Sequence, residues 1–96
     1  MYAQIVRFRL KPDTDAARFL HLTTDMVTWL GQQDGFLAYE LYQGCDFWCD
    51  RILWSAKETA HAGLERFLAT ALGKEIAACV DMDHCDVFFG AAITTS

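Results

Sequence analysis

The order of the periodic segments in this chain predicts an α+β fold: a ferredoxin-like βαββαβ unit with a four-stranded antiparallel sheet and helices on one face. Three observations support this prediction. Apolar and polar residues alternate near the start, an apolar stripe with helical spacing follows, and two strand-like segments separated by a short turn occupy the middle. A chain of 96 residues has room for one domain, which we place at residues 1–96.

The first strand is expected from Ala3 to Leu10, where β-branched and aromatic residues alternate with arginines and other residues. Pro12 and Asp13 end this strand. Asp13 is also the expected N-cap of a helix that runs from Thr14 to about Leu30, because an aspartate side chain can accept a hydrogen bond from the first turn.

The second and third strands are expected at Phe36 to Gln43 and at Phe47 to Trp54, after a glycine-bracketed turn. Only a short turn separates them, so the two should form a hairpin. Ser55 and Glu58 then have the spacing of a capping box, which predicts the start of the second helix.

The remainder of the chain predicts one interrupted helix and a final strand. Gly73 is expected to break the second helix, and a short piece from Lys74 to Val80 to continue it. The residues Asp81 to His84 are expected to form a polar connection. Apolar residues alternate from Val87 to Ile93, which predicts the last strand.

The composition excludes several classes of protein. A chain that is 53% apolar and 22% charged is not disordered. The formal net charge is −5 and the basic residues are not clustered, so we expect no nucleic-acid partner. Apolar runs are too short for a signal peptide or a membrane span, which predicts a soluble, cytoplasmic protein without a membrane partner. In that compartment the four cysteines are expected to be thiols. They are Cys45, Cys49, Cys79 and Cys85.

Three arginines on the predicted strands are the first candidate site residues: Arg7, Arg9 and Arg51. An unpaired arginine cannot face the helix layer, because burying its charge costs several kcal/mol. The arginine side of the first strand should therefore face away from the helices. Two readings remain open: a clamp for an anion or enolate in a cleft, or structural ion pairs at a dimer interface.

His61 is the second candidate, since it flanks the apolar stripe of the second helix and could act as a general base. The alternative is a surface histidine. The segment from Cys79 to Asp86 is the only part of the chain that is dense in metal-ligating residue types. A solvated loop explains the same residues, so we predict no dedicated metal site.

The aromatic residues of the strands are numerous enough to furnish both faces of the sheet. Tyr39 and Trp54 are expected to wall a small-molecule pocket. The helices cover only one face, yet successive residues such as Phe88 and Phe89 place apolar side chains on both. We therefore expect a homodimer that pairs sheet to sheet.

Three short stretches together resemble the antibiotic-biosynthesis-monooxygenase-like proteins of the dimeric α+β barrel superfamily. They are Phe8 to Pro12, Gly35 to Leu41 and the strand end Trp54-Ser55. The resemblance implies two ferredoxin-like subunits paired sheet to sheet, with a ligand cleft in each. Some members oxidise phenolic or anthrone-type substrates with O2 and no cofactor, and others cleave haem. The haem-cleaving branch uses an asparagine on the first strand, and this chain contains none.

Two functions follow from this resemblance and from the residues. The first is a small cofactor-independent monooxygenase acting on an electron-rich aromatic or polyketide-like compound. In it, His61 is the base, Arg7 or Arg51 stabilises the anion, and Tyr39 and Trp54 form walls. Arg9 is a further candidate for substrate binding. The second is a non-catalytic dimeric ligand-binding or accessory protein, because no convincing acid–base pair is evident in the sequence.

Overall fold

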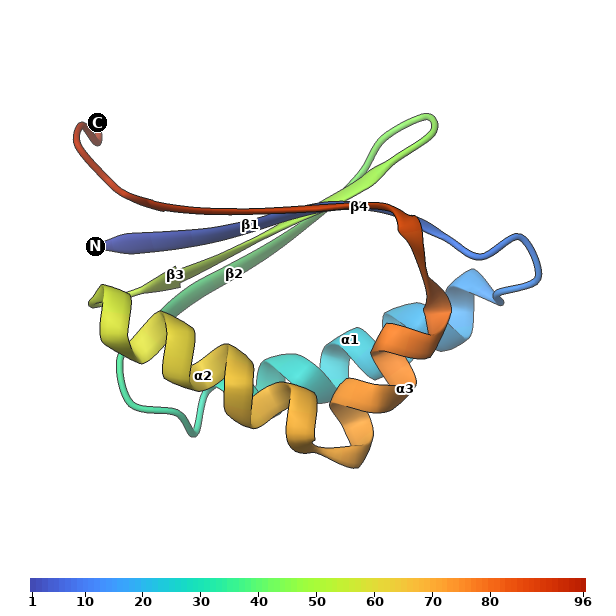
Figure 1. Cartoon of the computed structure of the whole chain (residues 1–96), viewed down its shortest axis with the longest axis horizontal. Helices are drawn as coiled ribbons and strands as arrows, with labels where there is room; N and C mark the ends of the chain where they lie inside the picture. Colours follow the sequence, from blue (N-terminus) through green and yellow to red (C-terminus); the bar gives the residue numbers. More distant parts are fainter.

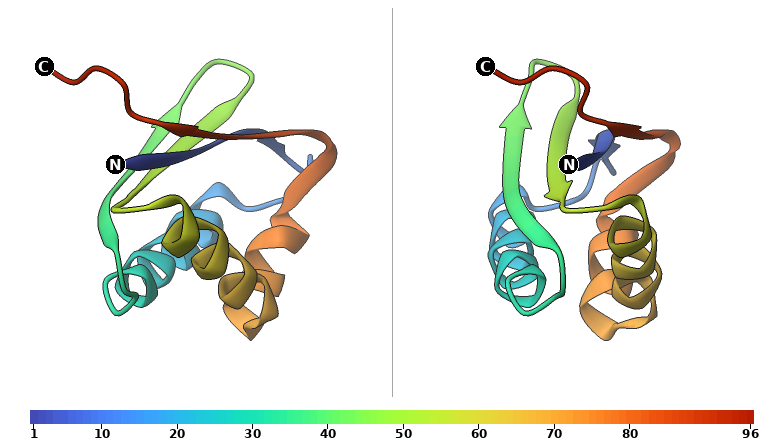
Figure 2. Two further views of the ribbon diagram at one scale, coloured as in Figure 1. Left: turned by 60° about the vertical axis from the view of Figure 1, so that its left-hand side comes forward. Right: turned by 90° about the vertical axis from the view of Figure 1, so that its left-hand side faces the viewer.

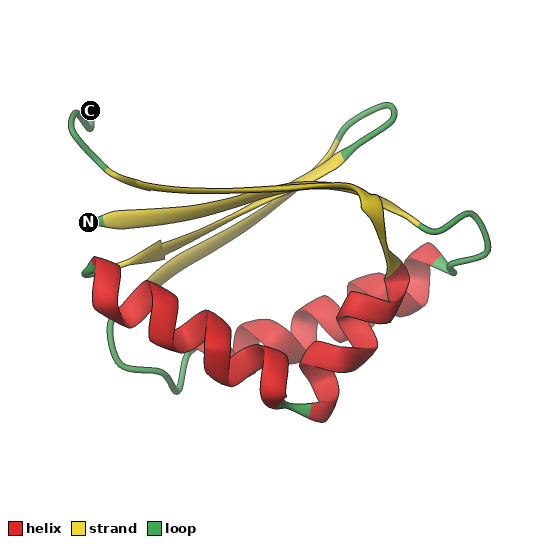
Figure 3. Ribbon diagram, viewed as in Figure 1, coloured by secondary structure: helices red, strands yellow, loops and turns green.

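A computed structural model describes all 96 residues and confirms the predicted fold class. Four antiparallel strands form one sheet in the order β2-β3-β1-β4. Three helices lie in a second layer against one face of it, and the other face has no helix (Figures 1 and 3). The elements are β1 Tyr2–Leu10, α1 Ala16–Leu30, β2 Phe36–Gln43, β3 Trp48–Trp54, α2 Lys57–Ala69, α3 Ala71–Cys79 and β4 Val80–Ala91.

The alternation along β1 decides which side chains meet the helices. Gln4 and Phe8 are buried on the helix side, whereas Arg7 is exposed on the opposite side. The prediction that the arginines of this strand face away from the helix layer is therefore confirmed. None of the helices is long and apolar enough to span a bilayer, and all four cysteines are free thiols.

The first two helices begin later than the sequence indicated. The α1 N-cap is Asp15 rather than Asp13, and its carboxylate accepts a hydrogen bond from the Ala17 N–H at 3.0 Å. Helix α2 has Ala56 at its N-cap in place of Ser55. The Thr59 hydroxyl, rather than Glu58, serves this end, lying 3.3 Å from the Ala56 N–H. Each correction moves the boundary by one or two residues, because more than one neighbouring side chain can cap these ends.

The break between the last two helices is at Thr70, not at Gly73. The Thr70 hydroxyl accepts a hydrogen bond from the Gly73 N–H at 2.9 Å, so it caps α3 while Gly73 lies inside that helix. Strand β4 begins directly at Val80. The residues Asp81 to His84, expected as a connection, are part of it.

Strand β4 is bent where it leaves α3. Its first residues rise steeply from the helix and the rest runs along β1 (Figures 1 and 2). The pairing register between β1 and β4 shifts between Phe8 and Arg9, which is the irregularity that accommodates the bend. The bend lifts the middle of β4 away from the helix layer.

Candidate functional site

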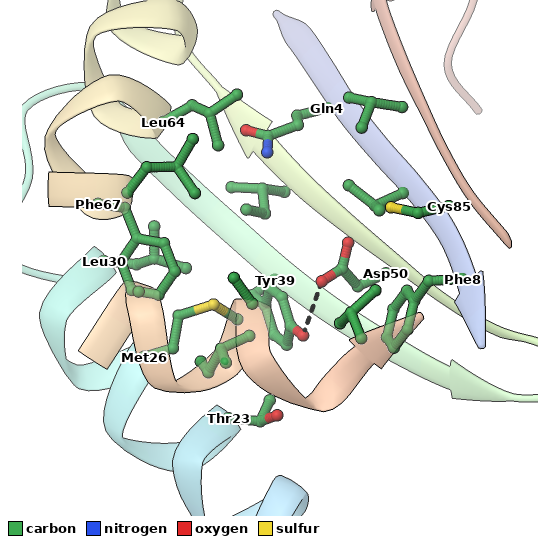
Figure 4. Close-up of a pocket in the computed structure, with 18 of the residues that line it drawn as sticks. Gln4, Phe8, Thr23, Met26, Leu30, Tyr39, Asp50, Leu64, Phe67 and Cys85 are labelled. Atoms are coloured by element: carbon green, nitrogen blue, oxygen red, sulfur yellow. Dashed lines mark hydrogen bonds between the residues drawn. The ribbon is translucent and has the colours of Figure 1, made fainter. Parts of the chain in front are cut away.

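A cavity of about 280 Å³ lies between the sheet and the helices. Of its 22 lining residues, 17 are hydrophobic, so a ligand there would be held mainly by apolar contacts. Residues from all four strands form one wall, and residues from the helices form the other (Figure 4). Leu68, Met82 and Val87 are the exposed members of the lining. The mouth of the cavity therefore lies between α2 and the β4 edge.

A tyrosine and an aspartate form a hydrogen bond on the sheet side of this cavity. The Tyr39 hydroxyl donates a hydrogen bond to Oδ2 of Asp50 at 3.2 Å (Figure 4). The two residues come from adjacent strands, β2 and β3, and both line the cavity. The other carboxylate oxygen, Oδ1, is buried without a hydrogen bond of good geometry. Asp50 therefore retains an acceptor for a ligand that carries a hydrogen-bond donor.

A backbone irregularity brings Tyr39 to the cavity. The β2–β3 register shifts between Phe36 and Ala38, so that Tyr39 pairs with Ile52 and shares its face of the sheet. Phe36, three residues earlier, also packs towards the helices, where its ring lies 6.1 Å from that of Trp54. A regular strand would put residues three apart on opposite faces. The bulge is thus what allows β2 to supply both side chains.

The apolar surroundings change the acidity of both groups. Burial raises the pKa of Asp50 from 3.8 to about 6, and the hydrogen bonds from the Tyr39 hydroxyl and the Val6 N–H offset only part of this rise. The pKa of Tyr39 is raised above its usual value by burial first and then by the neighbouring carboxylate. Near neutral pH the pair consists of a carboxylate and a neutral phenol, so Asp50 is the base.

Two further polar groups of the lining lack partners. Gln4 is 3% exposed and its amide oxygen Oε1 has no hydrogen bond, and Trp54 is 1% exposed with an unpartnered indole Nε1. An unsatisfied buried polar group costs about 1–3 kcal/mol. Buried groups of this kind are uncommon in folded proteins, and each calls for an explanation. Gln4 and Asp50 are the two site residues that the sequence reasoning did not select.

No arginine, lysine or histidine lines the cavity. Its ionisable side chains are Asp50, Tyr39 and Cys85, and each of these has its pKa raised by burial. A buried anion would therefore meet a carboxylate and no counter-charge. The electrostatics of the cavity favour an uncharged ligand.

The structure separates the predicted site residues into two groups. Tyr39 and Trp54 line the cavity, and their role in binding a ligand stays a prediction. The three arginines do not. Arg7 pairs with Asp86 at 3.0 Å on the outer face of the sheet. The Arg51 Nε donates to Glu40 at 2.7 Å.

Arg9 also lies on the outer face. Its guanidinium carbon and that of Arg7 each lie 4.5 Å from the ring centroid of Phe47. The catalytic role of Arg7 and the binding roles of Arg9 and Arg51 stay predictions, and any such role would act at the outer face.

His61 is exposed on α2 and does not line the cavity. Its ring stacks on Phe89 with a centroid separation of 4.4 Å, and the ring of Tyr2 lies 5.9 Å away. Its role as a base stays a prediction. In the segment from Cys79 to Asp86, the His84 Nδ1 lies 3.0 Å from Asp81, but no group of three ligating side chains is arranged to hold a metal ion.

Comparison with solved structures places this geometry in context. A crystal structure of a variant of SnoaB, a cofactor-independent oxygenase from Streptomyces nogalater, superimposes with a TM-score of 0.82 at 13% identity, covering 98% of this chain and 94% of that one. A structure of an antibiotic biosynthesis monooxygenase matches with a TM-score of 0.75 at 21% identity, covering 98% and 100% of the two chains. The chain has the antibiotic-biosynthesis-monooxygenase fold.

Further solved structures agree with this assignment of the fold. A putative antibiotic biosynthesis monooxygenase from Nitrosomonas europaea has a TM-score of 0.76 at 16% identity, over 98% of this chain and 100% of that one. No protein-family model and no curated protein matches the sequence. At these identities the comparison establishes the fold, and the activity has to be argued from the site.

Proposed function

We propose that this chain is a cofactor-independent oxygenase whose substrate is an electron-rich aromatic compound bound in the sheet–helix cavity, with Asp50 as the general base. The observation that carries the proposal is a carboxylate in an apolar cavity, hydrogen-bonded by Tyr39 and free to accept at its second oxygen. The fold shared with SnoaB, an oxygenase of this kind, supports it.

The chemistry requires a base and a dry pocket. Asp50 takes a proton from an acidic C–H or O–H bond of the substrate, which leaves a carbanion or phenolate. This anion reduces O2, the co-substrate, by one-electron steps. For an activated methylene, two C–H bonds are replaced by one C=O bond, one oxygen atom enters the product and the other leaves as water. Apolar walls exclude solvent from the anion while this occurs.

The hydrogen-bond donors of the cavity would stabilise the anion. The Trp54 indole N–H is a buried, cavity-lining donor without a partner, and the amide nitrogen of the cavity-lining Gln4 is a second donor. Donors that are already in place when negative charge develops lower the barrier without a reorganisation cost. In this proposal, neutral hydrogen-bond donors stabilise the substrate anion, which is the role that the sequence analysis gave to Arg7 or Arg51.

The proposal extends to a homodimer that pairs the open faces of two sheets. The outer face carries Ile5, Leu53 and Phe88, and Phe88 is 62% exposed. Two of the three arginines of this face are already paired, Arg7 with Asp86 and Arg51 with Glu40, and Arg9 lies over the Phe47 ring. A face whose centre is apolar and most of whose charges are paired can be covered by a second copy at a reduced electrostatic cost.

The same ion pairs favour a second candidate function. Because Arg7 and Arg51 are each held by a carboxylate, neither is free to clamp an anionic substrate. This arrangement fits a non-catalytic dimeric protein that binds a small aromatic molecule in the cavity. It differs from the oxygenase in one measurable respect, since the bound molecule would be returned unchanged.

Oxygen consumption separates the two functions. We expect the purified protein to consume O2 with an anthrone and to convert its methylene group to the second carbonyl of the anthraquinone, with one water released for each O2. Asp50→Asn should lower the rate by at least about 100-fold, because general-base catalysis contributes roughly 100- to 10,000-fold. Asp25→Asn, an exposed change on α1, is the matched control and should retain the rate. Tight binding with no O2 uptake would overturn the oxygenase and support the binding protein.

A further inference from the structure

A row of side chains on α2 borders the opening of the cavity. Leu64 and Leu68 line the cavity, and His61 lies nearly one turn before Leu64 on the same helix. Residues spaced by three or four positions share one face of a helix. His61 therefore extends this row towards the start of α2, beyond the lining itself.

A second row lies on β4, along the other side of the opening. Cys85 and Val87 line the cavity, and Phe89 is the next residue of the strand on the same face. The pairing of β4 with β1 is regular from Cys85 to Ala91, so the alternation continues unbroken to Phe89. We call the space between these two rows the α2–β4 seam.

The two rows touch at one end of the seam and separate at the other. The rings of His61 and Phe89 stack with their centroids 4.4 Å apart. At the other end Leu68 is 51% exposed and Val87 is 52% exposed, so neither row covers the other there. Figure 1 shows the first turns of α2 close to the sheet and its last turns farther from it. The seam is thus closed by rings at one end and open at the other.

A third ring completes the closed end. The ring of Tyr2, on β1, lies 5.9 Å from that of His61 and 6.2 Å from that of Phe89, so three elements meet there. The other two histidines of the chain, His21 and His84, each form an ion-pair contact with an aspartate, and His61 forms none. Ring packing is therefore what holds the His61 side chain in place.

We propose that the His61–Phe89 stack is a gate of the cavity. While the two rings are in contact the α2–β4 seam is narrow, and when they part it widens and lets a ligand enter or leave. An aromatic pair adds only a modest free energy to the contact, so a stack at an exposed position opens and closes readily. The inference concerns how any ligand reaches the cavity. It therefore stands apart from the oxygenase function, and it gives His61 a role other than that of a base.

The kinetics of ligand exchange test the gate. The probe is N-phenyl-1-naphthylamine, an uncharged aromatic molecule whose fluorescence rises in apolar surroundings, and its binding is followed by stopped flow. His61→Ala removes one ring of the stack. The association and dissociation rate constants should both rise by the same factor, about 2- to 10-fold, which is what an aromatic pair contributes to an equilibrium constant. Kd should stay unchanged, because a gate alters the passage of a ligand and not its bound state.

Two further variants separate stacking from other effects. His61→Phe keeps a ring against Phe89 and removes the ionisable nitrogen atoms, so it should exchange the probe at the native rates. His21→Ala removes a histidine that is exposed on α1, and it is the matched control that should also keep these rates.

Three results would contradict the gate. Native exchange rates in His61→Ala, or rates in His61→Phe as fast as those in His61→Ala, would show that the stack does not control passage. Weaker binding caused by faster dissociation alone would show that the His61 ring contacts the ligand instead. A probe that binds to none of these proteins would show that the seam admits no aromatic ligand of this size, and the proposal would be rejected.

Discussion

The Tyr39 hydroxyl lies 3.2 Å from Oδ2 of Asp50, and this contact joins two strands inside an otherwise apolar cavity. It gives the carboxylate one side-chain hydrogen bond, in addition to the contact from the Val6 N–H. It leaves the second carboxylate oxygen without a partner of good geometry. A group held in this way is oriented but not neutralised, since no cation is near it. The contact therefore offsets part of the rise that burial causes in the pKa of Asp50, and it fixes the direction in which the carboxylate can take a proton.

The reaction rate should depend on pH through Asp50. Because burial raises the pKa of this carboxyl to about 6, the free-enzyme kcat/KM for O2 consumption should rise as the pH passes through about 6 and then level off. The Tyr39→Phe variant should move the inflection to higher pH, because the Tyr39 hydrogen bond lowers the pKa of Asp50. Rate profiles of the two proteins test this, and an unshifted inflection would contradict the role of the pair.

The stability of the protein should also depend on pH through Asp50. Its pKa is raised from 3.8 to about 6, so the folded state holds the proton more tightly than the unfolded chain does. The resulting stabilisation is complete below pH 3.8 and is lost as the pH rises through about 6. Its upper limit is about 3 kcal/mol, since one pKa unit is worth about 1.4 kcal/mol.

The measurement is urea unfolding of the native protein and of Asp50→Asn at about pH 4.5 and about pH 7.5. The amide that the variant carries at this position cannot ionise, so the free energy of unfolding of the native protein should fall relative to the variant between these two values. Glu40 and Asp81 have lowered pKa values and act in the opposite direction, but they are present in both proteins and cancel in the difference. A difference that does not change with pH would show that Asp50 titrates as in the unfolded chain.

The fold could be predicted because the sequence patterns that specify its helices and strands involve residues close together in the chain. Period-two alternation, an apolar helical stripe and a short turn each depend on neighbouring residues, and together they restrict the topology. Helix boundaries were placed one to three residues away, as at Asp15 and Thr70. The alternation of residues could also have indicated the two buried polar side chains of the site. Gln4 occupies a position among the apolar residues of its strand face, and Asp50 lies on the same face as Ile52 and Trp54.

The hydrogen bond between Tyr39 and Asp50 could not be predicted in the same way. It depends on the register shift between Phe36 and Ala38, which turns Tyr39 to the face that Asp50 occupies. One inserted residue reverses the inward and outward positions of a strand, and the β-propensity of the residues does not reveal it. Likewise the partner of Arg7 is Asp86, on β4, and this depends on the register of the two strands.

Gly63 on α2 is expected to be required for the position of Trp54. A Cβ atom at Gly63 would overlap the Trp54 ring, with Cζ2 only 2.8 Å away. Gly63→Ala should therefore lower the free energy of unfolding by about 1–3 kcal/mol, as overpacked cores do. It should also push the indole towards the cavity and weaken the binding of an anthrone. Urea unfolding and calorimetry measure the two effects.

Gly31→Ala is the matched control for this change. Gly31 has an ordinary right-handed backbone, and the nearest atoms to an added Cβ lie at 3.5 Å and 3.6 Å. The substitution should leave the stability unchanged or slightly increased. If Gly63→Ala is as stable as Gly31→Ala, the Trp54 ring can move to accommodate the added methyl group, and the prediction is wrong.

The outer face of the sheet should be the interface of a homodimer. Ile5 and Phe88 are directly opposite each other on β1 and β4, and Leu53 lies on the same face of β3. Covering such a face with a second copy is favourable by roughly 25 cal/mol for each Å² of apolar area removed from water. The pairing of Arg7 with Asp86 limits the cost of burying charge there.

A charge introduced at the centre of this face should break the dimer. Phe88→Glu places two like charges near each other across the two-fold axis and should weaken association by at least about tenfold, because a central aromatic side chain commonly accounts for more than 1 kcal/mol of binding. Leu20→Glu, at an exposed apolar position of α1, is the control and should remain dimeric. Light scattering at micromolar concentration gives the mass of each protein. A folded native monomer under these conditions would reject the sheet-to-sheet pairing, whereas the cavity and Asp50 belong to one subunit and would still stand.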